Sequence, residues 1–184
     1  MIAQNPNSLL QALFGVLTQS IRFYARYAIP IIGPGLLSSV GRAIQLGWSE
    51  YLSGMEYLLL ELMVEAARVA IFLAVVGEGS FTAGVTAIKS VWNTAGYVSI
   101  WNNLKARWVA VIWSIAAFII FACLVNLVIN LIAHNDTVIS AVRNLGFPPT
   151  KDESLRFAVL FFLKNITIIP FTLVWMCCLY RLLK

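Results

Sequence analysis

The chain has 184 residues, of which 60% are hydrophobic, and its mean hydropathy of +0.85 lies above the range of soluble globular domains. Its net charge of +5 comes from 13 Lys and Arg against 8 Asp and Glu that are spread along the chain, so no nucleic-acid partner is expected. Long unbroken apolar runs exclude a transmembrane β-barrel. We therefore expect an all-α, polytopic transmembrane helix bundle in one integral membrane domain (1–184), with three to four spans plus amphipathic interfacial helices.

Residues 8–28 predict an amphipathic helix that lies at the membrane interface. Its polar positions fall within about 80° of one another on a helical wheel, and its apolar positions lie mostly on the opposite side. Arg22 and Arg26 belong to the polar face and suit the anionic surface of a cytoplasmic leaflet, although packing against the protein's own bundle explains the pattern equally well. The two prolines and two glycines of residues 27–35 are then expected to break the helix.

Residues 36–56 predict a second, longer amphipathic helix, which is either interfacial or a span. Six polar side chains recur in it at steps of three and four residues, which places them on one narrow stripe. This stripe consists of Ser38, Arg42, Gln45, Ser49, Ser53 and Glu56. We interpret it as the wall of an aqueous path, as a docking face for a partner, or as the solvated face of an interfacial helix.

Residues 57–77 predict a span that carries three charged side chains, Glu61, Glu65 and Arg68. Each charge at a helix centre costs about 2.5–3.5 kcal/mol on insertion scales, so this helix would insert poorly alone. The three positions fall within about 60° of arc, so Arg68 can pair with Glu65, whereas Glu61 has no obvious local partner. The cluster is expected to serve assembly or transport.

Residues 81–94 predict a short interfacial connector, with Ser80 as its N-cap. The apolar run of the central span, 106–133, begins at Trp108, contains no charge and is long enough to cross a bilayer. Asn126, Asn130 and His134 form a polar stripe on it at steps of four residues, and amides in lipid favour bonds to another helix. The single histidine is either a polar contact residue or a proton carrier.

Residues 151–180 predict the last span. Thr150, followed three residues later by Glu153, fits a capping box directly before the apolar run. Lys164 lies about two turns inside the span, where it can extend to the near surface or pair with Glu61. Pro170 is expected to kink the helix.

The distribution of cations predicts the orientation of the last two spans. Five Lys and Arg fall on one side of them and three on the other, which favours the first side, with the C-terminus, as cytoplasmic. The membrane is expected to be a bacterial inner membrane or another cytoplasm-facing membrane. If 36–56 lies flat there are three spans, and if it crosses there are four; both versions remain open.

No motif predicts catalysis. The chain contains one histidine and three cysteines, and it lacks the nucleophile, metal-binding and nucleotide-binding signatures of common enzymes, so no cofactor, metal or enzymatic activity is expected. The hypothesis that the sequence favours is a non-catalytic integral membrane subunit, which uses intramembrane polar contacts to assemble with itself or with other subunits in the lipid bilayer. The alternative is a small transporter or channel whose path follows the polar stripe and the Glu61, Glu65 and Arg68 cluster.

Overall fold

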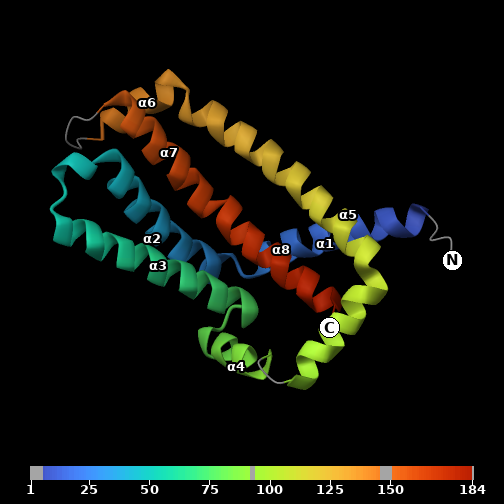
Figure 1. The fold of residues 1–184 in the computed structure, drawn as a ribbon. Helices are drawn as coiled ribbons and strands as arrows, with labels where there is room; N and C mark the ends of the chain where they lie inside the picture. Colours follow the sequence, from blue (N-terminus) through green and yellow to red (C-terminus); the bar gives the residue numbers. More distant parts are fainter. Residues whose placement is uncertain (1–5, 92–93, 146–150, 184) are drawn as a thin grey trace. The chain divides into compact units, whose positions relative to one another are not determined.

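The computed structural model describes residues 6–91, 94–145 and 151–183, and every regular element within these ranges is a helix. The elements follow one another along the chain as drawn in Figure 1. They are α1 (Pro6–Arg26), α2 (Ala28–Gly47), the short 3-10 helix η1 (Ser49–Tyr51), α3 (Gly54–Val76), α4 (Phe81–Val91), α5 (Thr94–Ala133), α6 (Asp136–Arg143), α7 (Asp152–Ile166) and α8 (Ile168–Leu183). The predicted all-α class is confirmed.

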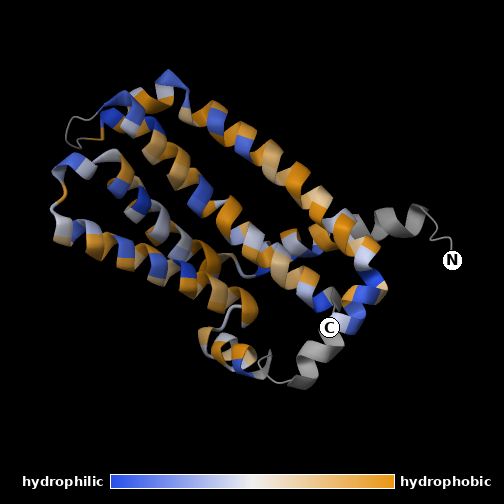
Figure 2. Cartoon of the chain, in the orientation of Figure 1, coloured by the Kyte–Doolittle hydropathy of each residue, from blue (hydrophilic) through white to orange (hydrophobic). Residues whose placement is uncertain are grey.

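Two stretches of the described chain are long and apolar enough to cross a membrane. They are Trp101–Ala133 in α5 and Asp152–Arg181 in α7 and α8, and Figure 2 shows how strongly apolar residues dominate α5. There is a third candidate if Phe14–Arg26 and Ala28–Gly47 together form one broken span. These two helices meet at Tyr27 with a bend of 82°. The chain is therefore a helical membrane protein with two to three candidate spans by length and composition.

Helix α3 covers the predicted span 57–77 but is not among these candidates. Glu61, Glu65 and Arg68 all lie within its apolar stretch, and their combined insertion cost is too high for a helix judged by composition alone. Whether α3 enters the bilayer therefore depends on how its neighbours neutralise these charges.

The prediction of one helix over 36–56 is wrong. Helix α2 ends at Gly47, η1 follows, and α3 starts at Gly54, so Ser49 lies in the connecting turn. The reason is a capping box: the Ser53 backbone N–H donates to the Glu56 carboxylate (2.8 Å), and the Glu56 N–H donates to the Ser53 hydroxyl (3.3 Å). These two residues start a new helix instead of extending the stripe of α2.

The predicted break over 27–35 is confirmed at its first residue, but the prolines and glycines that follow do not extend it. Helix α2 continues through Pro34, and the interruption is confined to Tyr27. Proline is tolerated inside membrane helices because neighbouring groups and local adjustment compensate for the lost backbone bond.

The remaining boundaries lie close to the predictions except for the start of α5. The Ser80 hydroxyl accepts from the Ala83 N–H (3.4 Å) at the start of α4, as an N-cap does. Helix α5 begins earlier than predicted and is kinked at Arg107. The last span is interrupted at Thr167, three residues before Pro170, in agreement with the predicted kink. Thr150 lies outside the described residues, and α7 begins after Lys151.

The chain divides into two compact units, and each is described by itself. Unit 1 comprises 1–31, 72–122 and 171–184. Aromatic contacts link its helices: the Phe118 and Trp175 rings stack with centroids 4.5 Å apart, and the Phe121 and Phe171 rings are 4.8 Å apart. These contacts join the first part of α5 to α8.

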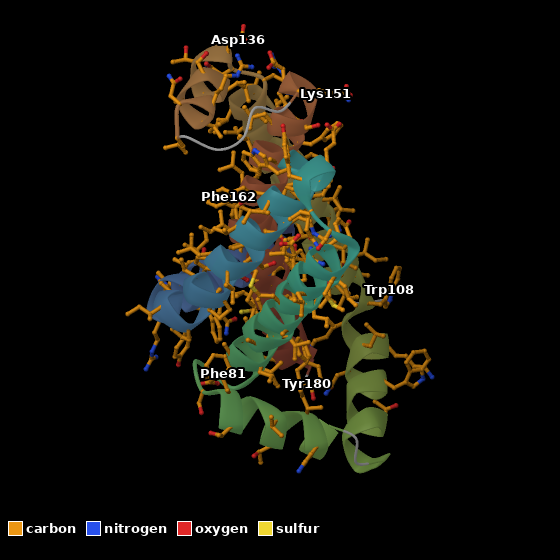
Figure 3. The ribbon with its side chains drawn as sticks, turned by 90° about the vertical axis from the view of Figure 1, so that its left-hand side faces the viewer. Phe81, Trp108, Asp136, Lys151, Phe162 and Tyr180 are labelled. Atoms are coloured by element: carbon orange, nitrogen blue, oxygen red, sulfur yellow. The ribbon has the colours of Figure 1, made fainter. Side chains whose placement is uncertain are left out.

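Unit 2 comprises 32–71 and 123–170 and contains the predicted polar cluster. Its parts of α2 and α3 are antiparallel neighbours joined by the turn at 48–53 (Figure 1). Helix α6 packs on α7, and Figure 3 shows Asp136 and Lys151 at this end of the unit, with Phe162 farther along α7. One apolar core, called here the corner core, fastens the turn to this end; it consists of Trp48, Ile139, Leu155 and Ala158.

Candidate functional site

Seven polar side chains from three helices of unit 2 form one hydrogen-bonded cluster, which we call the polar network. Helices α2 and α3 contribute three residues each and α7 contributes one. The network consists of Ser38, Arg42 and Gln45 on α2, Glu61, Glu65 and Arg68 on α3, and Asn165 on α7.

One half of the network is organised around Glu61. Arg42 donates to both carboxylate oxygens of Glu61, with N–O distances of 3.0 and 3.2 Å. Gln45 donates its Nε2 to the same carboxylate (3.0 Å) and to the Tyr57 carbonyl (3.2 Å). The two-point fork of arginine is the geometry that holds a carboxylate most tightly. Glu61, which has no partner within its own helix, is therefore paired across the interface between α2 and α3.

The other half is organised around Asn165. Its Oδ1 accepts hydrogen bonds from the Ser38 hydroxyl and from Arg68, both at 3.2 Å. Its Nδ2 donates to the Phe161 carbonyl one turn earlier on α7 (2.8 Å). Arg68 also pairs with Glu65, as its spacing in the sequence predicts, and Glu65 lies 3.5 Å from Arg42. The two halves are thus joined by ion pairs.

The network is electrically balanced, and its neutral members are buried while its charged side chains are partly exposed. Two arginines face two glutamates, so its formal charge is zero, and Gln45 and Asn165 are each only 1% exposed. Glu65 is the outermost charge, with 51% of its side chain exposed. A balanced set of ion pairs has no unpaired base or nucleophile, so it is suited to holding helices together more than to chemistry on a substrate.

Two buried polar atoms of the network have no partner among the described residues, Gln45 Oε1 and Arg68 Nε. The orientation of the Gln45 amide is fixed by its surroundings. Its other end faces two acceptors, the Tyr57 carbonyl and Glu61, so exchanging oxygen and nitrogen would place like dipoles together. These two atoms mark the places where a water molecule or a polar guest would be most favourable.

Lys164 takes no part in the ion pairs described above, although it directly precedes Asn165. The predicted option of pairing with Glu61 is wrong, because Arg42 occupies that carboxylate; the ammonium group lies 5.7 Å from the centre of the Phe161 ring. Sequence reasoning selected Lys164 by its charge and missed Asn165. The available signal was the isolated amide within an apolar run, which is costly in lipid unless it is bonded to another helix.

The predicted polar stripe of α5 is satisfied in part along its own helix. Asn130 donates its side-chain amide to the Asn126 carbonyl (3.0 Å), and the His134 ring lies 2.9 Å from the Asn130 carbonyl. Asn130 and His134 are exposed. Arg156 of α7 closes this end of α5, because it donates to the His134 carbonyl (2.9 Å) and pairs with Asp136.

The other predicted residues lie away from the network. Arg22 and Arg26 are exposed on α1 in unit 1, and Arg26 lies 5.5 Å from the centre of the Tyr27 ring. Ser53 and Glu56 form the capping box, whose hydrogen bonds hold the pKa of the Glu56 carboxyl below its usual value. Of the six residues of the predicted stripe, only Ser38, Arg42 and Gln45 therefore belong to the network.

Within the described part of the chain, no group of three or more His, Cys, Asp or Glu side chains is placed to hold a metal ion. No protein-family model, curated protein or solved structure matches this chain.

Proposed function

We propose that this chain is a non-catalytic integral membrane subunit that assembles with other membrane chains or with copies of itself. The observation that carries the proposal is the surface of α5. Of the most apolar 18 residues of the candidate span in α5, only 6% are buried within the chain. The corresponding share for the candidate span Asp152–Arg181 is 33%. A long span that its own chain leaves so bare is available to another helix.

The predicted stripe of Asn126, Asn130 and His134 favours a protein over lipid as the neighbour of α5. Asn130 is exposed on this helix, and an amide in a bilayer is stabilised by bonds to another helix that acyl chains cannot offer, worth about 0.6–2 kcal/mol each. The internally balanced polar network explains how the rest of unit 2 stays folded without such a partner. Assembly is therefore assigned to α5 and internal cohesion to α2, α3 and α7.

Photo-crosslinking in native membranes tests this assignment. Leu127 on α5 is replaced by Cys and labelled with benzophenone maleimide, in a chain whose three native cysteines are replaced by Ala. We expect a protein adduct from this position, and a several-fold lower yield when Asn130→Leu is added. The matched control is Leu62→Cys on α3, which is similarly exposed (60% against 58%). Its exposed neighbours Leu58 and Leu59 are apolar, and Glu65, three residues later, is paired with Arg68. Equal yields from the two positions, or no protein adduct from Leu127→Cys, would overturn the proposal.

The competing function is a small transporter or channel, and the exposure of Glu65 favours it. This carboxylate lies between Arg42 and Arg68 at the outer edge of the network, where a polar solute can reach it. In proteoliposomes this function predicts a flux that falls at least tenfold in Glu65→Gln and is retained in Glu153→Gln. A chain that assembles normally and shows no flux under any gradient would exclude it.

The proposed location is a bacterial inner membrane or another cytoplasm-facing membrane, with the C-terminus in the cytoplasm. The support is the excess of Lys and Arg on that side of the last two spans.

A further inference from the structure

Helix α2 follows α7 in an antiparallel direction over the length of unit 2. At one end, a Cβ atom on Gly47 would lie 3.0 Å from the Ala158 Cβ. Toward the other end, a Cβ atom on Gly35 would lie 3.9 Å from the Asn165 carbonyl oxygen of α7 and from the Pro170 ring, which belongs to α8. The Ser38 hydroxyl also bonds to Asn165, so α2 lies beside α7 from Ala158 to Asn165. The absence of a side chain at Gly47 permits the tighter of these two contacts, whereas a Cβ at Gly35 would meet its neighbours at ordinary contact distance.

The depth of this contact in the membrane follows from α7. Asn165 lies 13 residues after Asp152 and 16 residues before Arg181, near the middle of that candidate span and about 20 Å along it at 1.5 Å per residue. Ser38 and Arg68 both bond to Asn165. Where α7 crosses the bilayer, α2 and α3 accordingly reach its centre.

The turn between α2 and α3 shows at which membrane face these two helices are joined. Trp48 packs into the corner core with residues of α6 and α7, and Glu50 pairs with Lys151 at 3.0 Å. Lys151 directly precedes the span. The turn at 48–53 therefore lies at the membrane face from which α7 starts.

The outward side of α3 carries an apolar stripe, which Glu65 borders along one edge. The charged positions lie along one edge of the helix, whereas five large apolar side chains, each more than half exposed, lie on the side directed away from its buried face. These five are Met55, Leu58, Leu59, Leu62 and Val69.

We propose that α2 and α3 form a hairpin inserted in the bilayer beside α7, with lipid acyl chains covering the apolar stripe of α3. The ion pairs from Arg42 to Glu61 and from Arg68 to Glu65 remove the net charge that keeps α3 from inserting alone. Hydrocarbon is the partner that fits the stripe, because it is apolar throughout and continues to the depth of a candidate span. Of the two helices of this hairpin, α3 is the one that length and composition do not reveal as a span.

Spin-label accessibility tests this topology in reconstituted protein. Leu62→Cys, in the cysteine-free chain, carries a nitroxide, and its collision rates with oxygen and with a water-soluble nickel chelate are compared. The membrane control is Leu124→Cys, exposed to a similar degree on α5, and the water control is Ser140→Cys on α6. We expect the Leu62 label to share the low nickel accessibility of the Leu124 label and to have an oxygen accessibility at least as high, because lipid covers α3 whereas a partner helix covers α5. A nickel accessibility equal to that of Ser140 would overturn the proposal.

Sidedness provides a second measurement that does not depend on depth. In sealed vesicles of one orientation, a membrane-impermeant maleimide is expected to label Ser49→Cys and Ser140→Cys from the same side and Ser80→Cys, after α3, from the opposite side. Labelling of Ser49→Cys and Ser80→Cys from one side would contradict an inserted hairpin that crosses.

Discussion

At the scale of single residues, the fork between Arg42 and Glu61 is the strongest cross-helix contact of the polar network. It joins α2 to α3 through two hydrogen bonds, and Gln45 adds a third to the same carboxylate. Removing one partner of such a pair leaves the other charge without compensation, which costs more than the pair contributes. The network should therefore respond strongly to single substitutions and weakly to matched double ones.

Arg42→Met is expected to lower the free energy of unfolding in detergent micelles by about 1–3 kcal/mol, less than for a fully buried pair because 37% of the Glu61 side chain is exposed. The double variant Arg42→Met, Glu61→Met should recover much of this loss. Denaturant titration followed by helical circular dichroism measures both. Lys151→Met, which breaks an exposed pair, is the control and should cost less than about 1 kcal/mol. An equal loss of unfolding free energy in Arg42→Met and Lys151→Met would contradict the account.

The capping box predicts a pH dependence at the start of α3. Hydrogen bonds from Ser53 hold the pKa of Glu56 below its ordinary value. A carboxyl whose folded pKa is lowered stabilises the fold above its unfolded pKa, and this contribution is lost as the pH falls through the folded pKa. The Ser53 amide resonance, followed by NMR from about pH 6 to about pH 2.5, should shift with a midpoint below about 4.3. The shift should vanish in Glu56→Gln, and a midpoint at or above about 4.3 would contradict this assignment.

The pattern of polar and charged residues in the sequence identified six of the seven network residues. It did not identify Asn165, which joins α7 to α2 and α3. The spacing of Glu65 and Arg68 predicts their pair within one helix. The partners of Glu61 and the role of Asn165 depend on contacts across helices, between residues that are 16 to 127 positions apart in the sequence. No local periodicity encodes such contacts. Isolated polar residues in apolar runs were the only signal for such contacts.

At the scale of elements, the turn at 48–53 decides the architecture of unit 2. The helical period of polar residues continues across Ser49 and Ser53, so periodicity alone predicts one helix over 36–56. The capping box ends that continuity and folds α3 back along α2. The opposite error occurs at Pro34, where a strong breaker is accommodated within α2. Local patterns therefore identified the helices better than their boundaries.

The connection between α3 and α4 in unit 1 depends on a close approach of two backbones. A Cβ atom on Gly84 would lie 2.2 Å from the Leu73 carbonyl oxygen, a contact that the backbone cannot relieve without moving a helix. Gly84→Ala is expected to destabilise the fold by about 1–3 kcal/mol, measured by thermal unfolding in detergent. Gly15→Ala is the control, because no atom lies within 4 Å of the position of its Cβ, and it should be neutral or stabilising by up to about 1 kcal/mol. Destabilisation of both variants to the same degree would contradict the tight crossing.

At the scale of the whole molecule, composition alone establishes a helical membrane protein, because hydropathy and unbroken apolar runs leave few other classes. The number of helices at membrane depth is harder to predict, since it depends on whether the charges of α3 are neutralised by α2. Function is harder still, because it resides in surfaces that the chain leaves uncovered. Among the described helices, α5 has the longest apolar surface, and it also carries the exposed amide of Asn130.

The native mass of the wild-type protein, extracted in mild detergent and corrected for bound detergent, tests the central claim of assembly most directly. The account predicts a particle that contains more than one chain, either several copies of the 20.4 kDa chain or this chain with other membrane proteins. A particle that contains a single 20.4 kDa chain at every ratio of protein to detergent would contradict it.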